Sequence, residues 1–299
     1  MSATSMKVGV QLPEVERPVG WPELAEMAAL IESAGFDSVW VGEHLLYEID
    51  GARVGPWEAW SVLAAVAATT ERVEIGPLVA ALPFHNPALL AKQAATVDEI
   101  SGGRLVLGIG AGWNQLEFRA FGLPFDRRVD RFAEGFEILR RLLAGERVEF
   151  HGEFHDVTGA ELLPRPRPGG PPLMIGSNGA RMLSIALPHV AAWNSWFTDF
   201  GNDPAQLRGL LERIDRACEA VGRDPATLEK TVAVLLKFDD QPSRRSAGTR
   251  PITGPTERMA ETLAEFAATG IGHVQLVLDP VTLESIERAA EVKAALSSV

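Results

Sequence analysis

Apolar and polar positions along the chain alternate between two periods, one typical of buried strands and one typical of amphipathic helices. Short apolar or β-branched runs are followed by longer segments in which apolar residues recur every three or four positions. This pattern predicts strands at residues 8–12, 38–41, 73–79, 105–109, 173–176, 190–197, 231–238 and 273–278. It predicts helices at residues 21–33, 56–70, 87–100, 126–143, 180–187, 204–221, 255–268 and 283–295.

Strict alternation of strands and helices predicts parallel strands joined by right-handed crossovers. Eight such units that close on themselves make an α/β fold of the (β/α)8 TIM barrel type, and 299 residues suffice for one barrel of about 250 residues with insertions. The alternative, an open doubly wound sheet, usually has fewer strands. We therefore expect a single barrel domain over residues 1–299, with its active site in the loops after the strands.

Two segments interrupt the alternation. Residues 145–172 hold two short alternating runs and a proline-rich stretch between the fourth helix and the fifth strand, which predicts a β-hairpin followed by a rigid connector. Residues 239–254 form a long polar loop that contains three arginines. A loop of this kind on the active-site face is often a lid, here one that would meet an anionic cofactor tail or substrate. A surface insertion without such a role is the alternative.

The balance of 28 Lys and Arg against 40 Asp and Glu gives a formal charge of -12. Nucleic-acid binding is therefore not expected, because it requires a basic surplus or a basic face. One cysteine, Cys218, excludes an internal disulfide framework and a thiolate metal cluster, and we expect no metal. The sequence shows neither a signal peptide nor a membrane span, so a cytoplasmic protein that acts on a small-molecule substrate is expected.

A glycine-rich stretch, SGGRLVLGIGAGWN, occupies residues 101–114. Its apolar centre predicts a buried strand, and Gly108, Gly110 and Gly112 predict a bare exit loop. Glycines there would allow positive φ angles and the close approach of a ligand to the backbone. The spacing G-x-G-x-G differs from the dinucleotide fingerprint G-x-G-x-x-G, so a Rossmann fold is not indicated. A tight strand-to-helix turn without a ligand is the alternative.

Of the six histidines, only His44 and His85 follow predicted strands. His44 is the stronger candidate for proton transfer, because it adjoins Glu43 at a strand end, where a neighbouring carboxylate or a ligand could fix its tautomer. A histidine bonded only to backbone near the barrel rim is the alternative. His85 is expected to be a loop residue before a helix.

The loop Gly176, Ser177, Asn178, Gly179 precedes a helix that contains Arg181. Backbone N–H groups at a helix start, two polar side chains and an arginine one turn later would suit a phosphate group. Simple capping of the helix by Ser177 or Asn178 would explain the same residues.

Lys237 ends another predicted strand, which raises a Schiff-base lyase as a different class of function. A solvated lysine is favoured instead, because Asp239 and Asp240 follow directly and would keep it charged.

Several segments together resemble the bacterial luciferase-like superfamily of flavin or deazaflavin oxidoreductases, which are (β/α)8 barrels. The matching segments are AGFDSVWVGEH at 34–44, HNPALLAKQAATVDEISGGRLVLGIGAGWNQLEFRAFGLPFDRR at 85–128, FHGEFHDVTGAELLPRP at 150–166 and GHVQL at 272–276. Within the superfamily the chain looks most like the branch that uses the deazaflavin coenzyme F420, with flavin mononucleotide (FMN) and monooxygenase chemistry as the alternative. A cofactor-binding barrel without catalysis is a third possibility.

The resemblance implies hydride transfer at the C5 carbon of the deazaflavin, with His44 and Glu43 as catalytic residues near its reactive edge. It also implies a non-prolyl cis peptide near Leu78 and Val79, ribityl and phosphate contacts from Asn114 and the 176–179 loop, and a homodimer. The residues predicted to bind the cofactor are Leu78, Val79, Ile109, Gly110, Asn114, Gly176, Ser177, Asn178, Gly179 and Arg181.

Overall fold

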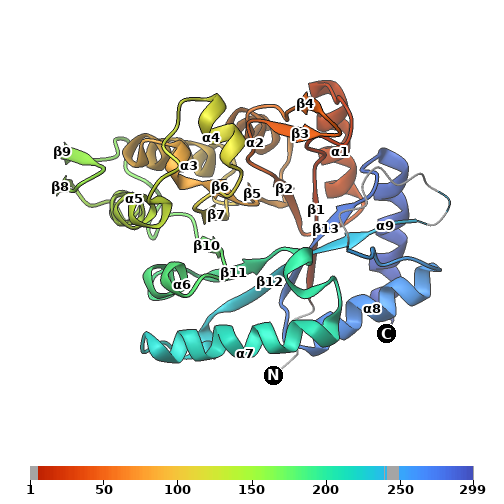
Figure 1. The fold of residues 1–299 in the computed structure, drawn as a ribbon. Helices are drawn as coiled ribbons and strands as arrows, with labels where there is room; N and C mark the ends of the chain where they lie inside the picture. Colours follow the sequence, from red (N-terminus) through yellow and green to blue (C-terminus); the bar gives the residue numbers. More distant parts are fainter. Residues whose placement is uncertain (1–5, 239, 241–248, 299) are drawn as a thin grey trace.

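Nine parallel strands form the central sheet of the computed structural model, which describes residues 6–238, 240 and 249–298 (Figure 1). Their order is β5-β2-β1-β13-β12-β11-β10-β7-β6. The strands are β1 (Lys7–Gln11), β2 (Ser38–Val41), β5 (Glu74–Pro77), β6 (Ala80–Ala81), β7 (Leu107–Gly110), β10 (Leu173–Gly176), β11 (Ala192–Ser195), β12 (Glu229–Leu236) and β13 (His273–Leu278).

The ends of this sheet meet, so the sheet closes into a barrel. Ile75 of β5 forms a parallel bridge with Leu105, and the Val106 amide donates to the Ile75 carbonyl at 2.8 Å. β5 pairs with β2 on one side, whereas β6 pairs with β7 on the other. β5 and β6 are thus two halves of one barrel strand, divided at residues 78–79, and the barrel has the eight strand positions that the sequence predicts.

Of the α-helices in the described residues, all but the short α4 (Gln115–Ala120) correspond to the eight predicted helices, and they surround the barrel (Figure 1). They are α1 (Trp21–Ser33), α2 (Ala59–Thr69), α3 (Pro87–Ile100), α5 (Arg128–Leu143), α6 (Ala180–Ala186), α7 (Pro204–Ala220), α8 (Thr256–Ala268) and α9 (Leu283–Leu296). None of the helices in the described part of the chain is both long and apolar enough to cross a membrane.

The structure corrects the sequence prediction at three places. The predicted strand 190–197 is shorter, because the chain turns after Ser195 into the 3-10 helix Phe197–Phe200. A hairpin of β3 (Tyr47–Ile49) and β4 (Ala52–Val54) follows β2, and a short helix, α4 (Gln115–Ala120), follows β7. Both are too short for a clear hydrophobic period, and both lie after barrel strands, at the end where active sites of this fold lie.

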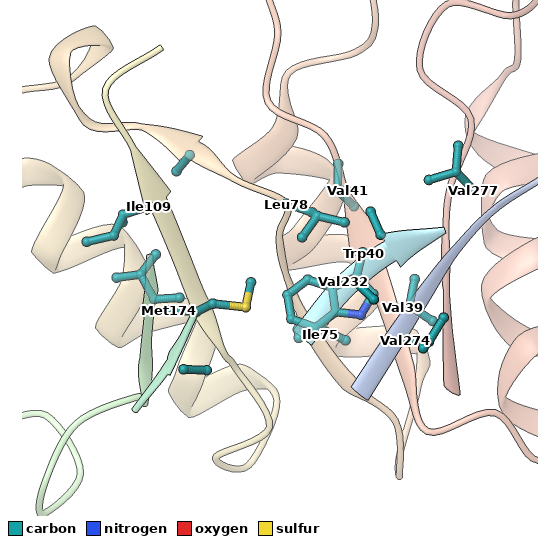
Figure 2. Close-up of a cluster of buried hydrophobic side chains, with 14 of the residues drawn as sticks. Val39, Trp40, Val41, Ile75, Leu78, Ile109, Met174, Val232, Val274 and Val277 are labelled. Atoms are coloured by element: carbon teal, nitrogen blue, oxygen red, sulfur yellow. The ribbon is translucent and has the colours of Figure 1, made fainter. Parts of the chain in front are cut away.

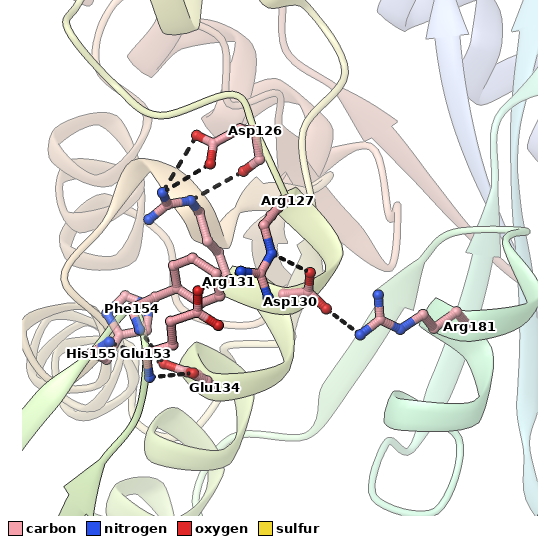
Figure 3. Close-up of polar contacts among 9 residues, drawn as sticks. All are labelled: Asp126, Arg127, Asp130, Arg131, Glu134, Glu153, Phe154, His155 and Arg181. Atoms are coloured by element: carbon pink, nitrogen blue, oxygen red, sulfur yellow. Dashed lines mark hydrogen bonds and ion pairs between the residues drawn. The ribbon is translucent and has the colours of Figure 1, made fainter.

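The predicted hairpin between α5 and β10 is confirmed by the antiparallel pair β8 (Val148–His151) and β9 (Asp156–Ala160). Its turn is held by Glu134 of α5, whose carboxylate accepts the backbone N–H groups of Glu153, Phe154 and His155 at 2.8–3.0 Å (Figure 3). The predicted lid at 239–254 lies largely outside the described residues.

The barrel core combines apolar layers with two buried clusters of hydrogen-bonded side chains. Figure 2 shows part of the apolar core, in which Trp40, Ile75, Leu78, Met174 and Val232 come together. Below the mouth, the Asn194 amide donates to Thr231 Oγ1 at 2.9 Å and to Gln275 Oε1 at 2.8 Å. Ser38 Oγ similarly joins His273 Nε2 and Trp40 Nε1, each at 2.7 Å. These bonds give partners to buried polar atoms whose burial would otherwise be costly, although Gln275 Nε2 has none among the described residues.

The arginine of the SGGR segment, Arg104, has a structural role. Its guanidinium donates to the carbonyls of Ala67, Thr70 and Val73 and to Thr70 Oγ1, at 2.7–2.9 Å. The carbonyls at the end of a helix have no partner within the helix, and a cationic side chain there is favourable. Arg104 therefore ties the end of α2 to the point at which the barrel closes.

Candidate active site

His44 follows β2 at the mouth of the barrel and is bonded to Glu117 of α4. Its Nδ1 lies 3.1 Å from Glu117 Oε1, and Glu117 has no exposed side-chain surface. The same carboxylate accepts the Leu45 amide at 2.8 Å. A carboxylate only accepts hydrogen bonds, so the proton must be on Nδ1 of the imidazole. The other ring nitrogen, Nε2, is thereby left to face a ligand.

The charges around His44 favour its protonated form. Burial lowers the pKa of His44, but the hydrogen bond to Glu117 and the negative charges of Glu14, Glu117 and Glu43 raise it more. The net result is a pKa above the ordinary value of 6.5. A raised pKa favours the protonated imidazole, which can give its proton to a reacting group.

Two aromatic rings pack against the imidazole. The Tyr47 ring centroid lies 4.6 Å from His44, and that of Trp113 lies 5.7 Å away in an edge-on arrangement. Tyr47 donates its hydroxyl to Glu14 Oε2 at 2.9 Å, and Gln11 donates to Glu14 Oε1 at 2.5 Å. The His44 ring therefore lies in a fixed aromatic and acidic setting, with the 65% exposed Trp113 open to a ligand.

Glu43 does not contact His44 in the way that the sequence suggested for a neighbouring carboxylate. Its Oε1 accepts Trp60 Nε1 at 3.0 Å and lies 2.9 Å from His85 Nε2, while its Oε2 accepts the Ala81 amide at 2.6 Å. Burial lowers the pKa of His85, but the hydrogen bond to Glu43 and the charges of Glu43 and Glu58 raise it by more. Glu43 thus fixes β6 and His85, whereas the carboxylate that holds His44 is Glu117. A catalytic role of Glu43 stays a prediction.

The predicted non-prolyl cis peptide is confirmed between Leu78 and Val79. The Val79 side chain lies in a hollow that three glycines leave open. A Cβ atom built on Gly108, Gly110 or Gly176 would come within 2.8–3.1 Å of the Val79 methyl groups. None of these three glycines has a positive φ angle, whereas Gly112 does, at 69°. At Gly108 and Gly110, the group that approaches the backbone closely is therefore the Val79 side chain. Close approach of a ligand to these glycines stays a prediction.

The neighbouring predicted contacts have mixed surroundings. Ile109 is fully buried and Gly110 is buried as well, so their contact with a cofactor stays a prediction. Asn114 accepts the Leu116 amide at 3.2 Å, which caps α4, and donates to the Leu46 carbonyl at 2.8 Å. Asn114 thus joins the loop after β7 to the loop after His44, and its contact with a cofactor stays a prediction.

The 176–179 loop has the polar atoms of an anion site. Gly179 caps α6 without a side-chain hydrogen bond, so the first N–H groups of this helix have no such partner. Asn178 Nδ2 donates to Ser195 Oγ at 3.0 Å and to Asp199 Oδ2 at 2.9 Å, while its Oδ1 is buried and unpaired among the described residues. The Ser177 carbonyl accepts Trp193 Nε1 at 3.0 Å.

Arg181 points away from the direction predicted for it. Its guanidinium is ion-paired with Asp130 of α5, which also binds Arg127 at 2.9 Å (Figure 3). The Arg181 side chain is 62% exposed. A phosphate contact from Arg181 would require this side chain to leave Asp130, and that contact stays a prediction.

Sequence reasoning missed the carboxylates of Glu117 and Glu14. Glu117 had a signal, because it is the glutamate of the G-W-x-x-x-E-F segment and lies in the first turn of a short helix after the glycine-rich strand. Among the residues that the structure describes, no group of three His, Cys, Asp or Glu side chains is suited to hold a metal.

Comparison with known proteins is decisive for the family. Residues 4–281 match the family model described as luciferase-like monooxygenase. The chain belongs to the luciferase-like monooxygenase family. A 5,10-methylenetetrahydromethanopterin reductase of Archaeoglobus fulgidus is 35% identical over 245 residues, which cover 81% of this chain and 68% of that protein. An F420-dependent glucose-6-phosphate dehydrogenase of Kineococcus radiotolerans is 30% identical over 237 residues, which cover 76% and 67%.

Solved structures of this family share the fold. An F420-dependent secondary alcohol dehydrogenase, in complex with an F420-acetone adduct, superposes with a TM-score of 0.83 over 97% of this chain and 99% of that chain, at 20% identity. This likeness confirms the barrel architecture. Membership of the family favours redox chemistry over the lyase chemistry considered for Lys237.

Proposed function

We propose that this protein is an oxidoreductase that transfers a hydride between coenzyme F420 and a small organic substrate, with His44 as the proton donor or acceptor. The observation that carries the proposal is the His44–Glu117 pair at the barrel mouth. It holds an imidazole in one tautomer, raises its pKa and directs its free nitrogen away from Glu117.

The residues at the mouth fit a deazaflavin with an anionic tail. The start of α6, where Gly179 gives no side-chain cap, offers backbone N–H groups to the tail. The cis peptide at Leu78–Val79 and the exposed ring of Trp113 would flank the deazaflavin ring. The dehydrogenase relative of Kineococcus radiotolerans is F420-dependent by its name, which supports the same cofactor here.

Bound F420 would supply or accept a hydride at its C5 carbon. Residues of the protein would orient the proton donor, transfer the proton and exclude water. Glu117 orients His44, and the Leu45 amide fixes Glu117. In the reducing direction, Nε2 of protonated His44 would give its proton to the substrate atom that becomes negative, and in the oxidising direction neutral His44 would take that proton. Tyr47 and Trp113 would exclude water from the imidazole.

FMN with oxygen chemistry is the second candidate, since the family description names monooxygenases. Titration of the purified protein with F420 and with FMN, followed by absorbance and fluorescence, separates the two. Tight binding of F420 alone is the expected result. Tight binding of FMN alone, with oxygen consumption by the reduced protein, would contradict the proposal.

A cytoplasmic homodimer is proposed for the working protein. The single cysteine, Cys218, is buried and free, which suits a reducing compartment. Light scattering of the purified protein is expected to give twice the chain mass of 32.3 kDa. A mass of 32.3 kDa at micromolar concentration would instead indicate a monomer.

A further inference from the structure

A cavity of about 380 Å³ lies beside the barrel mouth, between the loop after β1 and the chain that leaves β4. Its size is at the lower end of the range for small-molecule sites, roughly 300 to 1,000 Å³. One wall comes from residues 13–20 and Leu24, and the other from residues 54–57. His44 and Glu117 do not line it, but Glu14 does, and Glu14 accepts the hydroxyl of the Tyr47 ring that packs on His44.

The wall of this cavity is mainly apolar. It is formed largely by Val15, Val19, Leu24, Val54, Pro56 and Trp57. The Trp57 indole is fixed, because its Nε1 donates to the Val19 carbonyl at 2.7 Å, yet 64% of the residue is exposed. A rigid aromatic ring at the rim of an apolar cavity is a surface that an apolar molecule would cover.

The charges in the wall disfavour an anion. Among the described residues that line the cavity, Arg17 is the one cation, and both of its terminal nitrogens contact the carboxylate of Glu23. Glu14 is also part of the wall and adds a negative charge. A phosphorylated or carboxylated ligand would meet this carboxylate without a free cation to balance it.

Glu14 connects the cavity to the catalytic histidine. Its carboxylate accepts the Tyr47 hydroxyl, and the Tyr47 ring packs on His44. It also occupies the space above Gly42, where a Cβ atom would come within 1.6 Å of Glu14 Oε1. Tyr47 and Val54 are paired across the β3–β4 hairpin, so one short element contacts both His44 and the cavity.

We propose that this cavity binds the apolar part of the substrate, and that the substrate is a small, neutral, predominantly apolar carbonyl compound or the corresponding alcohol. The inference rests on the proposed function, because hydride and proton transfer to a carbonyl group convert it into an alcohol. The apolar frame would lie against Trp57 and Val54, with its oxygen directed past Glu14 towards His44. The β3–β4 hairpin and the loop after β1 would then set substrate specificity.

The test uses two probes, cyclohexanone and the anionic glucose 6-phosphate, and a matched pair of variants on one hairpin. Val54→Trp fills the cavity, whereas Ala52→Trp places the same side chain at an exposed position outside it. Binding is measured by saturation-transfer NMR without cofactor, and F420 binding by fluorescence. We expect cyclohexanone to bind the parent protein and Ala52→Trp alike, and Val54→Trp about tenfold or more weakly.

Trp57→Ala provides a second variant, because the loss of a largely exposed side chain does not threaten the fold. It is expected to weaken cyclohexanone binding severalfold and to leave F420 binding unchanged. Binding of glucose 6-phosphate but not cyclohexanone, binding of neither probe, or equal binding by Val54→Trp and Ala52→Trp would overturn the inference. A failure of F420 to bind, with the cyclohexanone results as expected, would overturn the proposed cofactor and leave the cavity assignment intact.

Discussion

His44 Nδ1 and Glu117 Oε1 lie 3.1 Å apart, although 73 positions separate the two residues in the chain. The contact exists because α4 begins directly after the glycine-rich strand and places Glu117 under the loop that leaves β2. The fully buried carboxylate has two backbone or side-chain donors from residues 44 and 45, which compensate for its burial. This contact therefore connects the loop after β2 to α4, and it also orients His44, the proposed proton-transfer group.

Replacement of His44 by Ala is expected to lower the turnover of F420 with its substrate by about 10²- to 10⁴-fold, the usual contribution of a general acid or base. F420 affinity should change little, because the ring and tail contacts remain. His151→Ala is the control, since His151 lies on the exposed hairpin. Turnover that survives in His44→Ala would remove His44 from the mechanism.

Glu117→Gln should lower the pKa of His44. The carboxylate raises this pKa through its hydrogen bond and its charge, so its neutralisation leaves only Glu14 and Glu43 to oppose the lowering of the pKa by burial. NMR titration of the labelled imidazole reports this shift without any turnover. In the reducing direction, the alkaline limb of the pH profile should move to lower pH by the same amount. An unchanged His44 titration would mean that Glu117 does not control it.

Gly176→Ala and Gly179→Ala should differ in stability although they lie in one loop. A Cβ at residue 176 would come within 2.8–2.9 Å of the Val79 methyl groups, whereas the nearest atom to one at residue 179 is 3.7 Å away. Overpacking of this kind costs about 1 to 3 kcal/mol. Urea unfolding should therefore show a loss for Gly176→Ala and almost none for Gly179→Ala. Equal stabilities would contradict the tight packing of Val79.

Acid should destabilise the fold through His273. Burial lowers the pKa of His273 from 6.5 to about 3, so between these values the unfolded chain binds a proton that the folded chain does not. This contribution is fully present above pH 6.5 and is lost as the pH falls towards 3. At pH 5 the loss is about 2 kcal/mol relative to neutral pH.

Urea unfolding of the parent protein and His273→Gln at both pH values measures this contribution. The parent protein should lose more stability than the variant between neutral pH and pH 5. The raised pKa values of His44 and His85 act in the opposite sense, since their contribution is lost as the pH rises, but they are common to both proteins. An identical pH dependence would show that His273 is not the cause.

The sequence was sufficient for the barrel, because eight amphipathic helices and eight apolar strands have clear periods. Helix Trp21–Ser33 and strand His273–Leu278 have the predicted bounds. α4 and the β3–β4 hairpin were missed, since six or fewer residues carry almost no periodic signal. These two elements contact His44, so the sequence predicted the architecture better than the site.

His44 could be selected from the sequence because the position of a residue after a strand is a topological property. Its partner could not, because side-chain direction at a strand end depends on the loops that pack there. Glu43 is adjacent in sequence but bonds to Trp60, Ala81 and His85. Arg181 likewise had a suitable position, but the carboxylate of Asp130 in another helix holds its guanidinium.

The hollow around Val79 has a consequence for how this protein can evolve. Gly108, Gly110 and Gly176 have ordinary φ angles, so their lack of a side chain serves volume and not backbone freedom. The Val79 isopropyl group fills the space left by the missing side chains of these three glycines. The size of residue 79 is therefore coupled to all three positions. At Gly110 and Gly176, where Val79 is the nearest obstacle, a change of shape is then accessible through compensated exchanges, in which residue 79 becomes smaller as the glycine gains a methyl group. At Gly108 such an exchange is closed, because a Cβ atom would lie 2.3 Å from the Pro77 carbonyl oxygen.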